Sequence, residues 1–250
     1  LIEQDITSVY TEETEILHKL MDGQEKLGFI SPLSYARSQG NLKIVSEFVV
    51  SSSQAGKNSL LFFKGDLKTI KKIFYAENSP MIEYHKILAD YVLKEIFDIV
   101  PVWEELADIT LDADTIKKYQ VIFLSGSMAY DSFVFFENYI DMTEEWSLKM
   151  DLPVVHLLLC ASQTFAEKEV LEKLGLSREI GLRNLMKISK SYASHHPQNW
   201  NIYFDLLSKN YRFYPELSDW EGLQKILDYC FYANVVDYLP EIKFLSSENS

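Results

Sequence analysis

The sequence is poor in the residues that make tight turns. It contains nine glycines and seven prolines in 250 residues, whereas typical proteins have about 7% glycine and about 5% proline. Folds built from short strands joined by tight hairpins depend on these residues. Their scarcity favours long helices with few tight turns, and we therefore expect an all-α protein.

Cysteine and positive charge are also scarce. The two cysteines, Cys160 and Cys230, lie in apolar surroundings, which predicts buried free thiols in a reducing, intracellular setting. The 24 basic residues are outnumbered by 37 acidic ones, which gives a net charge of -13. Because affinity for nucleic acids comes mainly from Lys and Arg that neutralise phosphates, we expect no nucleic-acid partner.

The sequence has no run of about 18 apolar residues free of charge, which is the minimum for a membrane-spanning helix. Its N-terminal stretch also lacks the basic segment and apolar run of a secretion signal. We therefore expect no membrane insertion and a cytoplasmic or intracellular location. At 250 residues the chain is long enough to bury a sizeable core in one domain or two.

The residues from Ser31 to Val49 have the signals of two short helices joined by a turn. Ser31 and Pro32 are typical of a helix start, because the serine hydroxyl accepts a hydrogen bond from the first turn and proline suits the first helical position. Gly40 favours the left-handed conformation that ends a helix. The apolar residues beyond it have helical spacing and predict a second helix: Leu42, Val45, Phe48 and Val49.

This segment resembles the helix–turn–helix unit of an ankyrin repeat. The residues in register with the family pattern are Ser31, Pro32, Leu33, Ala36, Gly40, Ile44, Val45, Phe48 and Val49. The segment departs from the pattern at Ser34, where the family has a histidine, and at Arg37, where it has a small alanine. A weaker match covers residues 65–74, which follow the pattern of a glycine, a turn and a second helix.

The resemblance implies ankyrin-like helical repeats over residues 1–78 that lead into an irregular α-helical body over residues 79–250, or one continuous helical domain over 1–250. It implies an α-solenoid module for protein–protein interaction, with another protein as its partner. Such a chain also resembles bacterial effectors that are secreted into a host cell and act on host proteins. The implied partner-binding residues, at the repeat tip, are Tyr35, Arg37, Ser38 and Gln39. We expect no cofactor, and the sequence leaves a small-molecule ligand open.

One segment favours a strand. Residues 119–124 form a dense, β-branched apolar run, and residues 125–129 follow it with an order similar to the nucleophile elbow of serine hydrolases. In that alternative, Ser127 is the nucleophile of a degenerate hydrolase. The partners that would complete its triad are Asp151 as the acid and His156, His195 or His196 as the base. Because Ser125 and Ala129 replace the usual glycines, we favour a buried helix and a non-enzymatic chain without catalytic residues.

The remaining polar groupings predict no metal site. His156 and Cys160 lie four residues apart but have no third ligand near them in the sequence. Acidic pairs occur at Asp112 with Asp114 and at Glu144 with Glu145. Carboxylates commonly gather at helix starts because they interact favourably with the helix dipole, so these pairs are not assigned a metal.

Overall fold

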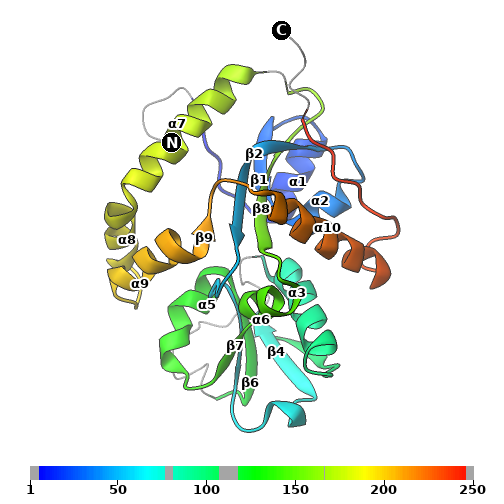
Figure 1. Cartoon of the computed structure of the whole chain (residues 1–250), viewed down its shortest axis with the longest axis vertical. Coiled ribbons are helices and arrows are strands. Elements are labelled where there is room, and N and C mark those ends of the chain that lie inside the picture. The colour runs from blue at the N-terminus through cyan, green and yellow to red at the C-terminus, as the bar shows by residue number, and fades with distance from the viewer. Residues whose placement is uncertain (1–5, 77–80, 107–117, 166, 246–250) are drawn as a thin grey trace. The chain divides into compact units, whose positions relative to one another are not determined.

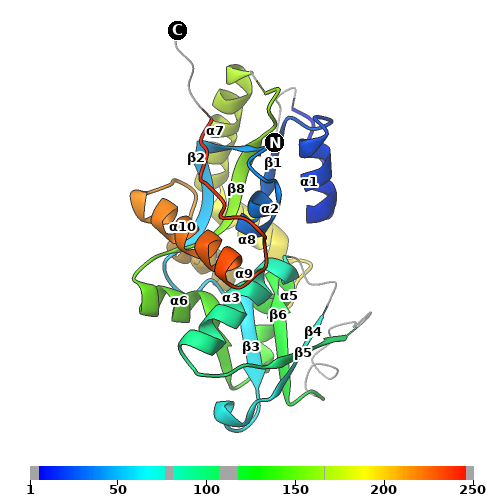
Figure 2. The same ribbon diagram turned by 90° about the vertical axis from the view of Figure 1, so that its right-hand side faces the viewer.

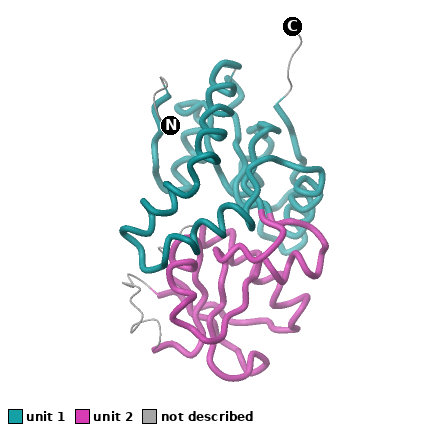
Figure 3. Tube along the Cα trace, turned by 60° about the vertical axis from the view of Figure 1, so that its left-hand side comes forward, with its two compact units in different colours: residues 1–51, 155–250 teal, residues 52–154 magenta. Residues whose placement is uncertain are grey.

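The structure is a computed structural model that describes residues 6–76, 81–106, 118–165 and 167–245. It is an α/β protein with two β-sheets (Figure 1 and Figure 2). The chain divides into two compact units (Figure 3). Unit 1 comprises Leu1–Ser51 and Val155–Ser250, and unit 2 comprises Ser52–Val154. This division differs from the predicted boundary at residue 78, which falls inside unit 2.

Unit 1 is built on a four-stranded sheet with the strand order β1-β8-β2-β9. Its strands are β1 (Leu27–Ile30), β2 (Lys43–Ser52), β8 (Val154–Ala161) and β9 (Tyr211–Arg212). β1 pairs antiparallel with β8. The apolar cluster on this sheet contains Val45 and Phe48 of β2, Leu159 and Ala161 of β8, and Phe165. β8 is apolar at all positions but one, which is typical of strands that are buried on both faces, whereas half of the residues of β2 are apolar.

The described residues of unit 1 also form six α-helices. They are α1 (Glu13–Met21), α2 (Pro32–Arg37), α7 (Lys168–Arg183), α8 (Leu185–Ala193), α9 (Trp200–Asp205) and α10 (Leu217–Tyr232). Helix α10 packs on α2, and α1 packs on α2 and β1. Figure 1 shows α7, α8 and α9 following one another along one side of this unit. A π-helical turn at Leu206–Asn210 leads from α9 into β9.

Unit 2 is built on a five-stranded mixed sheet with the order β5-β4-β6-β3-β7. Its strands are β3 (Ser59–Phe63), β4 (Lys72–Ala76), β5 (Val102–Leu106), β6 (Val121–Ser125) and β7 (Tyr139–Asp141). β4 runs parallel to β5 and β6, whereas β3 runs antiparallel to β6 and β7. Its helices are α3 (Ile82–Glu95), α5 (Gly126–Ser132) and α6 (Met142–Met150), with 3-10 turns at Leu67–Thr69 and Phe133–Phe135.

Both faces of the unit 2 sheet are covered. One face contributes Leu60, Phe62, Ile122 and Leu124 to a cluster with Ala129 of α5. The side chains that alternate with these in the strands lie on the opposite face, which faces α3 and α6. The central strand β6 is therefore buried at all five positions, which explains its unbroken apolar run.

The predicted all-α fold is wrong, and the segment that carried the ankyrin resemblance shows why. Residues 43–52 form β2 instead of a second helix. Half of the residues of β2 are apolar, and the buried ones include Val45, Phe48 and Val49, whose spacing also fits one face of a helix. The β-branched and aromatic residues of the segment fit a pleated, buried surface. The ankyrin-like solenoid over 1–78 and the helical body over 79–250 are therefore wrong too.

The predicted helix start at Ser31 is confirmed. Helix α2 begins at Pro32, and the Ser31 hydroxyl accepts a hydrogen bond from the Ser34 backbone N–H at 3.2 Å. Gly40 follows with a φ of 74°, the left-handed conformation predicted for it. Beyond Gly40 the chain enters a strand. The weaker match at residues 65–74 likewise forms a single 3-10 turn followed by β4, and it contains no helix pair.

Arg178 fixes α7 to the rest of unit 1. Its guanidinium carbon lies 4.5 Å from the centre of the Phe48 ring and 3.9 Å from the centre of the Tyr214 ring. The Nη1 atom donates to the Phe213 carbonyl at 3.0 Å and also to the Glu47 carbonyl. One guanidinium therefore joins α7 to β2 and to the segment that follows β9.

We expect R178K to lower the free energy of unfolding by ~1–2 kcal/mol. Lysine keeps the charge, but it has no planar group that stacks on two rings while donating in two directions. Urea unfolding measures the change, with R183K as the control because Arg183 is exposed on the same helix. Equal losses in the two variants would contradict a special role for Arg178.

Candidate functional site

Three connections meet at one end of the unit 2 sheet: the segment between β2 and β3, the turn from β6 into α5 and the turn from β7 into α6. Asn58 joins them, because its carbonyl accepts from the Gly126 N–H at 2.8 Å and its side-chain oxygen accepts from the Thr143 hydroxyl at 3.3 Å. We call this region the polar end of unit 2. It comprises Gly56, Lys57, Asn58, His85, Ser125, Gly126, Ser127, Asp141 and Thr143.

His85 contacts the serine that precedes α5. It lies on α3, is fully buried, and its Nδ1 is 2.5 Å from the Ser125 hydroxyl. Burial lowers the pKa of His85 to about 3, so the imidazole is neutral at neutral pH. Ser125 is the N-cap residue of α5, but its side chain makes no capping hydrogen bond to the helix. The serine oxygen contacts His85, and the first turn of α5 is not capped by its own N-cap side chain.

Asp141 fixes the connection between β2 and β3 to the start of α6. Its carboxylate is buried and accepts from the Lys57 N–H at 2.9 Å and from the Thr143 N–H at 3.0 Å. Burial raises the pKa of Asp141 to about 6, although these two N–H groups and the Lys57 ammonium lower it. The ammonium lies 3.9 Å from the carboxylate and donates to the Tyr139 hydroxyl at 3.0 Å. Asp141 is therefore part of the framework of the site.

Gly56 allows this connection to pack closely. A Cβ atom at this position would lie 2.9 Å from the Asn58 side-chain oxygen, closer than real Cβ contacts, and 3.1 Å from the Thr143 hydroxyl, which is also tight. Beside the buried framework residues, Ser127 is partly exposed as the second residue of α5. The polar end therefore presents a hydroxyl and a helix start held in place by buried hydrogen bonds.

The residues of the predicted hydrolase triad are placed as follows. The favoured interpretation of residues 119–124 as a buried helix is wrong, because β6 leads directly into α5, the strand and helix of the alternative interpretation. Asp151 is the C-cap residue of α6 in unit 2. His156 is a buried residue of β8 in unit 1, where its ring lies 5.4 Å from that of Tyr211. Ser125 is the serine that contacts a histidine at this turn, and no sequence motif had indicated that histidine, His85.

The two other histidines considered for the triad lie after α8 in unit 1. His195 is exposed, and the ring of His196 stacks on that of Tyr192 with 3.6 Å between the centres. The stacking accounts for the position of His196 without a catalytic role.

The predicted partner-binding residues lie at the end of α2 and in the turn after it. Tyr35 and Ser38 are buried, whereas Arg37 and Gln39 are exposed, so the four residues do not form one exposed surface. The Tyr35 hydroxyl donates to the Glu241 carbonyl at 2.8 Å and accepts from the Lys243 N–H at 2.9 Å. Tyr35 therefore holds the C-terminal segment of unit 1.

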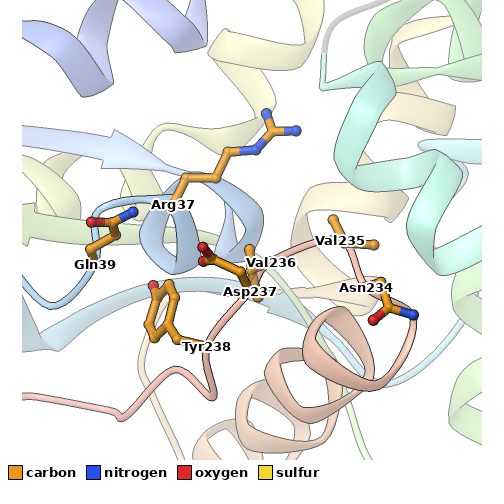
Figure 4. Close-up of a pocket in the computed structure, with 7 residues that line it drawn as sticks. All are labelled: Arg37, Gln39, Asn234, Val235, Val236, Asp237 and Tyr238. Carbon is orange, nitrogen blue, oxygen red and sulfur yellow. The ribbon is translucent and has the colours of Figure 1, made fainter.

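Arg37 and Gln39 line a pocket of about 360 Å³ in unit 1 (Figure 4). The other wall is the segment after α10: Asn234, Val235, Val236, Asp237 and Tyr238. A second pocket of about 240 Å³ shares Gln39 and Tyr238 with the first. Burial raises the pKa of Tyr238, and the neighbouring Asp237 acts in the same direction. The lining combines both charges, two amides and a phenol ring, which is suited to a small polar molecule.

No metal centre is visible in the described part of the chain, where no group of three or more His, Cys, Asp or Glu could hold an ion. Glu144 and Glu145 lie in the first turn of α6. Asp112 and Asp114 lie outside the described residues. The two cysteines are free and buried, as predicted, and burial raises the pKa of both thiols, to about 12 for Cys230.

No protein-family model matches the sequence, and no curated protein is significantly similar to it. Solved structures are similar to it in fold, at 11–16% sequence identity in the three described next. An ABC transporter structure from Parabacteroides distasonis matches with a TM-score of 0.64 and 12% identity, over 97% of this chain and 88% of its own.

Two further structures carry more informative descriptions. A Candida albicans gene product, described as having the generic periplasmic binding protein fold, matches with a TM-score of 0.61 and 11% identity, over 95% of this chain and 86% of its own. The alkanesulfonate-binding protein SsuA from Xanthomonas axonopodis pv. citri, bound to MOPS, matches with a TM-score of 0.58 and 16% identity, over 93% of this chain and 83% of its own. The chain therefore has the periplasmic-binding-protein fold.

This fold overturns the resemblance to ankyrin repeats and the function drawn from it. The α-solenoid interaction module and the related resemblance to effectors are wrong, because the segment that carried them is part of a mixed α/β unit. Another protein as the partner and the hydrolase alternative are overturned as well, since the similar structures include an alkanesulfonate-binding protein bound to MOPS. In the described ranges, no helix is long and apolar enough to cross a membrane.

Proposed function

We propose that this chain binds a small polar solute and that the polar end of unit 2 supplies contacts to it. The observation that carries the proposal is the fold, which extends over more than nine-tenths of the chain in the similar structures. One of those structures is described as an alkanesulfonate-binding protein bound to MOPS. The pockets of unit 1 are a separate surface and are not part of this proposal.

The chemistry of the polar end favours a solute that carries hydrogen-bond acceptor oxygens. The Ser127 hydroxyl is partly exposed and can donate a hydrogen bond to such an oxygen. His85 contacts the neighbouring Ser125 oxygen and so holds the residue that precedes this turn in place. Because buried hydrogen bonds already fix this turn, little ordering entropy is lost on binding.

The test is calorimetric titration of the purified chain with a panel of sulfonates, carboxylates and free amino acids, with MOPS as the first probe. For a solute that binds, we expect S127A to raise the dissociation constant about tenfold, since one hydrogen bond to a polar ligand contributes about 1.5 kcal/mol. S53A is the matched control, because Ser53 is an exposed serine of the same unit.

Two results would count against the proposal in different ways. If no member of the panel binds at millimolar concentration or raises the melting temperature, solute binding itself is contradicted. If a solute binds S127A and S53A equally well, solute binding stands and the assignment to the polar end fails. The cytoplasmic or intracellular location stays a prediction, which fractionation of the producing cells would test.

A further inference from the structure

Helix α7 has one anchored face and one exposed face. Val170, Leu171 and Leu174 pack on the apolar cluster of the unit 1 sheet, and Arg178 is held between two aromatic rings. None of the sixteen residues of α7 is fully buried. The opposite face carries a row of exposed residues spaced three and four apart, which we call the α7 stripe: Glu169, Glu172, Leu176, Ile180 and Arg183.

The centre of the α7 stripe is apolar and its ends are charged. Leu176 is 50% exposed and Ile180 is 40% exposed. An apolar centre surrounded by a charged rim is the general arrangement of a protein interface. The stripe is acidic towards the N-terminus of the helix at Glu169 and Glu172, and basic towards the C-terminus at Arg183.

We propose that the α7 stripe binds a second copy of this chain, with the two α7 helices antiparallel. A twofold axis through Leu176 places Glu169 of one copy opposite Arg183 of the other, because both residues are seven positions from Leu176. The same axis places Lys173 opposite Glu179. Leu176 then packs against its own counterpart, as residues on the axis of a symmetric interface do.

The charges favour a second copy in this one orientation. In the antiparallel arrangement Glu169 meets Arg183 at each end of the stripe and Glu172 lies opposite Ile180, whereas a parallel pair would place Glu169 against Glu169 and Arg183 against Arg183. Like charges that face each other across an interface are unfavourable. A stripe that is complementary to itself is a property expected of a homodimer, in which one surface serves both partners.

The size of the stripe sets the expected strength of the dimer. A helix of sixteen residues is about 24 Å long, and a single pair of helices buries less than the standard interface of about 1,600 Å². We therefore expect a reversible dimer with a dissociation constant of about 10 μM or weaker, which is further weakened by salt because its ion pairs lie at the rim.

The test is sedimentation velocity of the full chain from low micromolar to about 1 mM, for the native protein and two charge reversals. E169K places a lysine opposite Arg183, and R183E places a glutamate opposite Glu169, so each variant alone has like charges at both 169–183 pairs, while Lys173 and Glu179 are unchanged. We expect both to raise the dimer dissociation constant at least tenfold. An equimolar mixture of the two restores opposite charges on both sides of the axis, and we expect it to form a heterodimer.

Control variants separate the stripe from general charge effects. E221K and K225E make the same reversals at exposed positions of α10, which also has sixteen residues, and we expect them to dimerise like the native chain. L176Q should be monomeric with an unchanged circular dichroism spectrum, because Leu176 is 50% exposed in the single chain and is not part of the buried core. A native chain that is monomeric at 1 mM would overturn the dimer. If E169K and R183E each dimerise more weakly and their equimolar mixture also stays monomeric, the antiparallel pairing is overturned.

Discussion

The H85N variant is expected to be less stable than the native protein at pH 7 and more stable at pH 4. The native fold buries His85 as a neutral imidazole and lowers its pKa from 6.5 to about 3. Between these values the unfolded chain binds a proton that the folded chain excludes, so stability falls as the pH is lowered. The loss that this one group causes is ~3 kcal/mol by pH 4.

Asparagine does not titrate in this range, and it retains a short polar group next to the Ser125 hydroxyl. It also leaves space where the ring was, which we expect to cost ~1–2 kcal/mol at pH 7. Urea unfolding at intervals from pH 4 to pH 7 should therefore give stability curves that cross. H195N is the control, because His195 is exposed and its loss should leave the native pH profile unchanged. Parallel curves for H85N and the native protein would contradict a buried neutral His85.

Signals that lie within a few residues of one another predicted local structure well. The serine and proline at positions 31 and 32 start α2, and Gly40 after it adopts the left-handed conformation. In these cases the partner of each group lies within one or two helical turns. Interactions between residues close in sequence were therefore enough to predict these local structures.

Glycine content misled the prediction of fold class because this chain makes many turns without glycine. Six other residues adopt the left-handed conformation that glycine usually supplies: Gln39, Lys57, Met81, Asp98, Asp151 and Asn234. Such positions are sterically unfavourable for residues with a Cβ atom, and tertiary contacts must hold them. Amino-acid composition gives no information on such contacts, so a low glycine content did not mean that turns are few.

Strand pairing was the second source of error. β2 is flanked in its sheet by β8 and β9, which lie more than 100 residues later in the chain. Without those neighbours, residues 43–52 have the same apolar positions as one face of a helix. The strand interpretation of residues 121–125 was available because their β-branched run is denser, but low glycine content argued against it.

The candidate site could be predicted only in part. Ser127 was singled out because the turn after β6 is a local pattern, although the chemistry assigned to it was wrong. Asp141 also carries a local signal, since it is an aspartate directly before a helix and it accepts from the Thr143 N–H two residues later. His85 has no such signal, because its partner Ser125 lies 40 residues away and the two meet only in the folded unit.

The D141A variant is expected to lose ~2–4 kcal/mol of unfolding free energy at neutral pH. Its carboxylate accepts hydrogen bonds from the backbone N–H groups of Lys57 and Thr143, and the side chain is 2% exposed. Alanine leaves these donors in a closed region without their acceptor, at a cost of about 1–3 kcal/mol each. D66A is the matched control, because Asp66 accepts from the Lys68 N–H at 2.9 Å at an exposed turn. We expect D66A to lose less than about 1 kcal/mol.

The same variant should also make acid unfolding steeper. Burial raises the pKa of Asp141 from 3.8 to about 6, so in this range the folded chain holds a proton that the unfolded chain releases. Lowering the pH from 6 to 4 therefore stabilises the native protein through Asp141 by ~2 kcal/mol, which opposes the loss caused by His85. D141A removes the opposing contribution and keeps His85, so its stability should fall more steeply with acid than that of the native protein or of D66A. A shallower curve for D141A would show that Asp141 is ionised in the folded protein well below pH 6, with the hydrogen bonds to its carboxylate outweighing burial.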